Sequence, residues 1–135
     1  MATFVATDVR TEVNAVVLST FVTKVSLPIT VEELDDTAMG DTARSRVGGL
    51  KDCSATVEFN QDFAASAPDV TLFSLLGTVV TFKLRPTSSA ISTTNPEYQL
   101  SVLVSQYNPI DAGVGEKGTV KVTWPCVGAV TRATT

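Results

Sequence analysis

Side-chain character alternates strictly along residues 52–60, and this two-residue period constrains the fold more than any other feature of the chain. The odd-numbered positions hold small or apolar side chains, and the even-numbered positions hold polar or charged ones. Because successive side chains of a β-strand point to opposite faces, the pattern predicts a strand with one buried face.

Other short runs rich in β-branched residues follow the same pattern and lie between turn signals. The pair Asn14-Ala15 is a candidate turn within the first run, because Asn tolerates turn conformations. With charged residues at only 18% of the chain, such runs predict a mainly β protein. The predicted strands are 13–18, 21–27, 52–60, 78–85, 98–107, 118–124 and 127–131.

Residues 68–77 carry the clearest helix signal. Pro68 stands at a first-turn position, Asp69 follows it, and Gly77 stands at the end of the run. Apolar residues recur at Val70, Phe73 and Leu76. We therefore expect one short amphipathic helix that covers an open edge or end of the sheets. The predicted fold is a single domain over residues 1–135, a β-sandwich or barrel of about seven strands with one flanking helix.

Residues 29–49 have no sustained periodicity of either kind, which predicts a long loop. The segment carries five acidic residues, two arginines and three glycines. Long loops inside compact domains are uncommon, and those that are ordered often have a function. Three interpretations fit the segment: a calcium site, a solvated acidic loop, and an assembly loop whose carboxylates meet arginines of a neighbouring subunit. The calcium interpretation is the weakest, because Ala38 and Met39 occupy positions where oxygen ligands would be needed.

The assembly interpretation makes this loop the candidate functional site. Leu34 and Met39 support it, since apolar residues on a long exposed loop need a surface to dock on. The alternative is that both side chains fold back onto the loop's own sheet. The candidate subunit-interface residues are Glu32, Glu33, Leu34, Asp35, Asp36, Met39, Asp41, Arg44 and Arg46.

The sequence favours no enzymatic chemistry. It contains no histidine to activate a serine or threonine, and a Ser-Lys pairing is the one nucleophilic arrangement left. It has no phosphate-binding loop or dinucleotide motif, so we expect no cofactor and no catalytic or metal site. The net charge of −4, without a basic cluster, argues against gripping nucleic acid but suits a wall past which a polyanion slides.

Cys53 and Cys126 fit neither a disulfide scaffold nor a zinc site. Two buried free thiols are the favoured interpretation, because free cysteine is among the most buried residue types. A disulfide would require neighbouring strands and an oxidising environment. Residues 1–8 lack the basic and apolar regions of a signal peptide, and no apolar run is long enough to cross a bilayer. We therefore expect folding in the cytoplasm of the producing cell, with no membrane partner.

The order of these features resembles the tail tube proteins of long-tailed, lambda-like bacteriophages. The likeness covers most of the chain as an order of elements. It is most specific at Asp35 to Asp41 and at Gly49 to Asp62. The second segment is a Gly-Leu-Lys-Asp turn that leads into the alternating strand. The remaining matching segments are 18–27, the helix at 68–76, and the strands at 102–107 and 121–124.

The resemblance implies a β-sandwich that assembles into stacked rings, usually hexameric, around a lumen through which DNA passes as cargo. Residues 29–49 would be the loop that contacts the adjacent ring. The implied partners are further copies of the chain and other virion proteins, and the implied location is the virion, assembled in the host cytoplasm. The same fold also suits a capsid decoration protein or a head–tail connector, which needs only one adhesive face.

Overall fold

The structure is a computed structural model that describes residues 3–65 and 67–135. Met1 and Ala2, the start of the segment judged unlike a signal peptide, lie outside the described residues. Within these ranges the chain forms eight strands and one helix. In order they are β1 (Arg10–Val13), β2 (Val16–Val17), β3 (Val22–Ser26), β4 (Ile29–Asp35), β5 (Arg46–Asn60), α1 (Pro68–Phe73), β6 (Val79–Arg85), β7 (Glu97–Leu103) and β8 (Thr119–Ala133).

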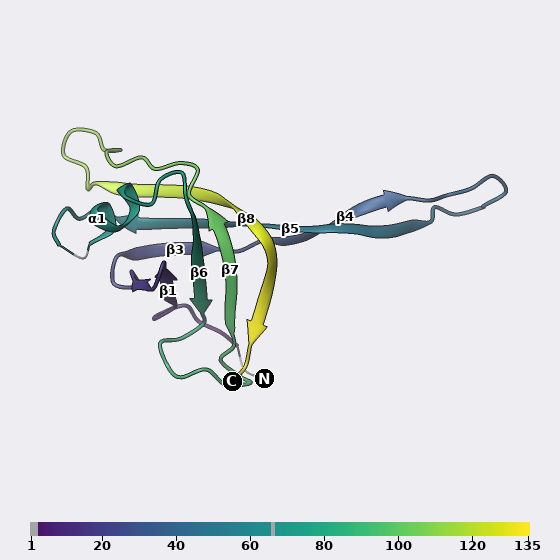
Figure 1. Ribbon diagram of the computed structural model, residues 1–135, viewed down its shortest axis with the longest axis horizontal. Helices are drawn as coiled ribbons and strands as arrows, with labels where there is room; N and C mark the ends of the chain where they lie inside the picture. The colour runs from purple at the N-terminus through teal and green to yellow at the C-terminus, as the bar shows by residue number, and fades with distance from the viewer. Residues whose placement is uncertain (1–2, 66) are drawn as a thin grey trace.

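The strands form one antiparallel sheet that curls into a half-barrel, which confirms the predicted mainly β fold. The order across the sheet is β2-β1-β6-β7-β8-β5-β3, with β4 paired to β5 away from this path. Strand β8 joins the two halves. Its first part pairs with β5 through residues 119–125, and its second part pairs with β7 through residues 126–133. In Figure 1 β8 runs along β5 and then bends away beside β7.

The bend in β8 explains why its sequence predicts two strands instead of one. Pro125 interrupts the alternation, and Gly128 adopts a φ of +87°, which favours glycine. The register against β7 shifts here, so β8 carries extra residues between Val127 and Thr131. The predicted break at residues 125–126 falls at Pro125, and the bulge lies inside the second predicted strand, 127–131.

The core lies between the two halves of the curled sheet. The buried side chains of the alternating strand β5 meet those of β6, β7 and β8. Phe82 and Trp124 pack edge to face with ring centroids 6.4 Å apart. The indole N–H of Trp124 donates to the carbonyl of Gln106 at 2.9 Å, so the buried ring leaves no polar atom unpaired.

Two short local predictions are confirmed. Asn14 and Ala15 form the turn between β1 and β2, with φ values of 49° and 67°. Helix α1 begins at Pro68, as the sequence predicted, and ends at Phe73. A turn follows it up to Gly77, whose φ is +87°. The predicted helix is longer than the observed one, because only residues 68–73 are helical.

The helix packs with the opposite face to the one its apolar stripe indicates. Leu72 is fully buried against the core, whereas Val70, Phe73 and Leu76 are exposed. Asp69 helps to fix this orientation, because its carboxylate accepts a hydrogen bond of 2.7 Å from the hydroxyl of Tyr107. The stripe at Val70, Phe73 and Leu76 is therefore not the core-facing side of the helix.

The prediction that residues 29–49 form an irregular loop is wrong. Residues 29–35 are strand β4, and residues 46–49 are the start of β5, which pairs antiparallel with β4. A register shift between Val31 and Glu33 explains why no period was visible, since it breaks the alternation. The ribbon projects far from the body of the molecule (Figure 1). We call residues 29–52 the arm.

Candidate assembly surface

The arm is a two-stranded ribbon exposed along its length. Every residue of β4 is exposed, as are most residues of β5 between positions 46 and 52. None of the residues that form the buried core comes from the arm. An isolated hairpin of this kind is marginally stable in water. The arm is thus a part of the chain that contact with another molecule would stabilise.

Charged residues of the arm pair with one another. Arg44 contacts Asp35 at 2.8 Å, and Arg46 contacts Glu33 at 2.6 Å. Hydrogen bonding with Thr37, together with the bond from Arg44, holds the pKa of Asp35 below its ordinary value. Both arginines predicted to serve a neighbouring subunit therefore have carboxylate partners within their own arm. Such exposed pairs contribute little to stability and mainly fix local geometry.

The tip of the arm, residues 36–45, is an ordered turn held by hydrogen bonds. The N–H of Thr37 donates to the carboxylate of Asp35 at 2.9 Å, and the N–H of Ala38 donates to the carboxylate of Asp41 at 2.8 Å. Gly40, with a φ of +92°, lets the chain reverse. The turn presents the Met39 side chain with full exposure at its end.

The two apolar residues singled out in the sequence behave differently. Leu34 lies across the arm, where its Cδ1 stands over Gly49 so closely that a side chain at position 49 would meet it at 3.2 Å. Met39 does not fold back, because it is fully exposed. Glu32 and Asp36 are exposed, and neither forms an ion pair among the described residues. The nine predicted interface residues thus share the arm, but only some of them are free for an outside partner.

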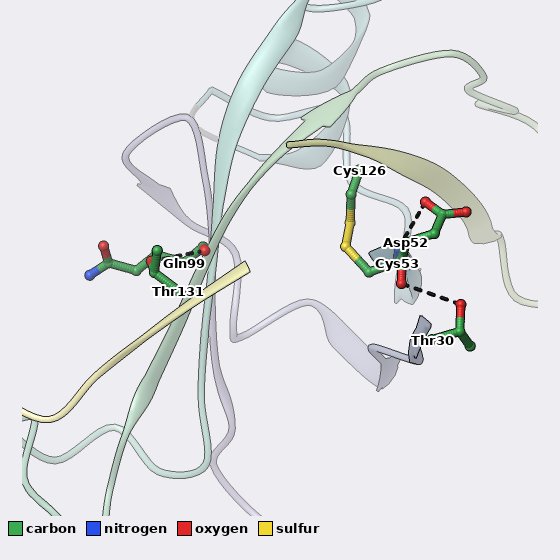
Figure 2. Close-up of a disulfide and its surroundings, with 6 residues drawn as sticks. All are labelled: Thr30, Asp52, Cys53, Gln99, Cys126 and Thr131. Carbon is green, nitrogen blue, oxygen red and sulfur yellow. Dashed lines mark hydrogen bonds between the residues drawn. A yellow bond between two sulfur atoms is a disulfide. The ribbon is translucent and has the colours of Figure 1, made fainter. Parts of the chain in front are cut away.

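A disulfide stands where the arm leaves the body. The last pair between β5 and β8 is Ser54 with Pro125, and the next residues, Cys53 and Cys126, are bonded to each other. Figure 2 shows this bond linking the two strands beside Asp52 and Thr30. The favoured sequence interpretation, two free thiols, is therefore wrong. The sequence could not settle the pairing, because Pro125 and the bulge hid which strand lies next to β5.

The strands diverge beyond the disulfide and leave a groove between them. Strand β5 continues into the arm, whereas β8 turns to pair with β7. The groove has a volume of about 290 Å³ and mostly apolar walls. We call it the fork groove; it is lined by Ile29, Val31, Lys51, Asp52, Cys53, Tyr98, Gly128, Ala129, Val130 and Arg132.

Two cations lie in the fork groove, and the sequence analysis did not single them out. Among the described residues neither Lys51 nor Arg132 forms an ion pair. Asp52, which also lines the groove, accepts a hydrogen bond of 2.9 Å from the N–H of Cys53. The sequence offered little sign of this groove. Lys51 and Arg132 are 81 positions apart in the chain, and they come together because β8 bends.

The described residues contain no helix that is long and apolar enough to cross a membrane. Residues 3–65 and 67–135 also bring together no group of three or more metal-ligating side chains.

Comparison with known proteins gives matches in fold alone. No protein-family model matches the chain, and no curated protein matches its sequence. A chain in the virion of a native gene transfer agent particle is similar over 93% of this chain and 95% of its own length, with 12% identity and a TM-score of 0.75. A chain in the tail of an empty gene transfer agent particle, refined with C6 symmetry, is similar over 82% and 81%, with 12% identity and a TM-score of 0.61.

A third solved structure with this fold comes from the baseplate of the anti-feeding prophage, symmetrised six-fold. It matches 98% of this chain and 97% of its own, with 12% identity and a TM-score of 0.53. By their descriptions, the three matched chains belong to a gene transfer agent virion, a gene transfer agent tail and a prophage baseplate, and this chain shares their fold over 82–98% of its length.

Proposed function

We propose that the chain is a structural subunit of a phage-type tail tube, which self-assembles into stacked rings that form a conduit for DNA. The arm is the observation that carries the proposal. It is long, exposed on both strands and absent from the core, so contact with a neighbouring molecule would stabilise it. The fold shared with a chain of a gene transfer agent virion and a chain of a gene transfer agent tail supports the tail context.

The arm would make the contacts between rings. Its interface would comprise the residues predicted from the sequence, with the ion pairs of Arg44 and Arg46 shaping the arm and the tip residues reaching the partner. Contacts of this kind are heterologous: a surface at one end of a subunit meets a different surface on the next. Heterologous contacts close into rings or continue as filaments.

Six-fold rings are the stoichiometry we propose. The descriptions of two matched particles carry six-fold symmetry, and the resemblance of the sequence implies the same number. The net charge of −4 suits a lumen that DNA passes without binding. The role is structural, in the virion, with assembly in the host cytoplasm and with other virion proteins as further partners.

Negative-stain microscopy and sedimentation of the purified full chain test this function. We expect tubes or stacked rings that pellet, since ring and stacking contacts repeat along the assembly. A chain that stays monomeric at every concentration from micromolar to millimolar would contradict the proposal.

A decoration or connector role is the second candidate. The likeness to a baseplate chain favours it, because this fold is not confined to tubes. A decoration or connector subunit would stay soluble alone and would bind a preformed head or tail end. Co-sedimentation with purified phage heads separates the two roles: only the second predicts binding without self-assembly.

A further inference from the structure

We propose that the tip of one copy's arm docks in the fork groove of a second copy, with Met39 entering the groove and the tip carboxylates facing Lys51 and Arg132. This inference rests on the proposed function, because it assigns the surface that receives the arm of a neighbouring subunit.

The tip is built to present one apolar side chain. Met39 is fully exposed, while hydrogen bonds from Thr37 and Ala38 to the carboxylates of Asp35 and Asp41 hold the turn around it. A fully exposed methionine on an ordered turn gains by burial, and its unbranched chain adapts to irregular gaps.

The fork groove offers such a gap. Ile29 and Val31 of the arm line it together with Val130 of β8, and the two arm residues are about half exposed. The two strand segments beside the groove each have one pairing partner in the described chain. Residues 46–53 of β5 pair with β4, and residues 126–133 of β8 pair with β7. Open strand edges accept further backbone hydrogen bonds, so an inserted turn can be held by its main chain as well.

The charges of the two surfaces are complementary, because the groove holds the two cations Lys51 and Arg132 against one carboxylate, Asp52. Asp36 and Asp41 at the tip have no cationic partner among the described residues, and the same holds for Lys51 and Arg132 in the groove. The arginines of the arm are occupied by Asp35 and Glu33, so they do not neutralise the tip. Complementary charges of this kind fix the partner and the register of a contact.

The length of the arm indicates that the tip docks in the groove of a second copy and not in its own. Ile29 lines the groove and Asp35 adjoins the tip, and the six residue steps between them span roughly 20 Å at about 3.3 Å per residue. The tip therefore cannot reach its own groove. Docking in the groove of the next copy gives a head-to-tail contact in which successive arms overlap.

Photo-cross-linking from the tip tests the contact directly. Met39→p-benzoylphenylalanine places a photoreactive group on the side chain that should enter the groove. In the full chain, we expect cross-linked dimers whose mass spectra join position 39 to peptides containing residues 51–53 or 127–132. The matched control is Val114→p-benzoylphenylalanine, which places the group on an equally exposed side chain of another loop and should give no such product.

A charge swap tests the pairing. We expect Arg132→Asp alone and Asp36→Lys alone each to raise the protein concentration needed for assembly about tenfold, and the double variant to return it to the wild-type range. Lys117→Asp makes the same charge change as Arg132→Asp at a loop residue outside both surfaces. It should leave the concentration needed for assembly unchanged. The midpoint of denaturant unfolding should be equal in all four variants, because every site is exposed.

The outcomes separate the two proposals. If the chain forms tubes but position 39 cross-links elsewhere, or the double variant is no better than the singles, the docking contact is wrong and the tube function stands. If the chain neither pellets nor cross-links at millimolar concentration, the tube function and the contact are both overturned.

Discussion

Glu97 is the most unusual single residue of the body, because it is a carboxylate with 2% of its surface exposed. Arg85 donates to it from Nε at 3.2 Å and also from a terminal nitrogen, and Gln99 donates at 2.8 Å. Arg10 lies 3.7 Å away. Burial raises the pKa of Glu97, but these hydrogen bonds and the charges of Arg85 and Lys83 outweigh burial, so its pKa lies below the ordinary value.

Replacing this carboxylate should destabilise the body in a pH-dependent way. We expect Glu97→Gln to lower the free energy of unfolding by about 3 kcal/mol at pH 7, because Arg85, whose side chain is only 13% exposed, is left without its counter-charge. A carboxyl with a lowered folded pKa adds stability above its unfolded pKa of about 4.3 and loses it as the pH falls through the folded pKa. The difference between variant and wild type should therefore shrink below about pH 4.

Urea unfolding followed by circular dichroism between pH 3 and pH 7 measures both effects. Glu32→Gln on the exposed arm is the control and should change stability by less than about 0.5 kcal/mol at any pH. A loss of stability in Glu97→Gln that is equal at pH 3 and pH 7 would show that the ion pair is not its cause.

At the scale of elements, the sequence predicts strands and helix ends that depend on local residue patterns. It does not predict orientations and contacts that depend on residues far apart in the chain. The alternation at residues 52–60 located the body half of β5, and Pro68 located the start of α1. The orientation of α1 was not predictable, because the contact between Asp69 and Tyr107 joins residues far apart in the chain. The arm was read as a loop because its register shift hides the alternation. The candidate interface residues of the arm were proposed from charge and, for Leu34 and Met39, from apolar character, and they remain predictions. The groove residues were not singled out.

The disulfide at the root of the arm gives an element-scale prediction. It closes a sequence separation of 73 residues, and a loop of that length corresponds to about 4 kcal/mol of stability in the chain-entropy account. We expect reduction with dithiothreitol to lower the free energy of unfolding by about that amount. It should also speed amide hydrogen exchange in residues 53–56, where β5 separates from β8.

Mass spectrometry and urea unfolding with and without reductant measure the effect. Cys53→Ala/Cys126→Ala is the control, since its stability should not respond to dithiothreitol. Because disulfides are rare in a reducing cytoplasm, we expect the bond in protein exposed to air and free thiols in freshly lysed cells. Free thiols that persist under oxidising glutathione buffer would contradict the pairing.

At the scale of the whole molecule, the buried core and the exposed arm occupy different parts of the chain. The buried core draws on residues up to Leu18 and from Cys53 onward, so the body holds its own hydrophobic interior. The arm adds exposed strands, a charged tip and one wall of the fork groove. We therefore expect the body to keep its fold when the arm is removed.

Shortening the arm tests that separation. Replacing residues 32–50 by Asn-Gly joins the paired residues Val31 and Lys51 through a two-residue hairpin turn. We expect the shortened chain to unfold within about 0.5 kcal/mol of the full chain with nearly the same dependence on urea, because little buried area is removed. The same chain should sediment as free subunits or single rings and form no stacked tubes. A shortened chain that fails to fold would show that the arm belongs to the folding unit, and one that still stacks would show that other surfaces join the rings.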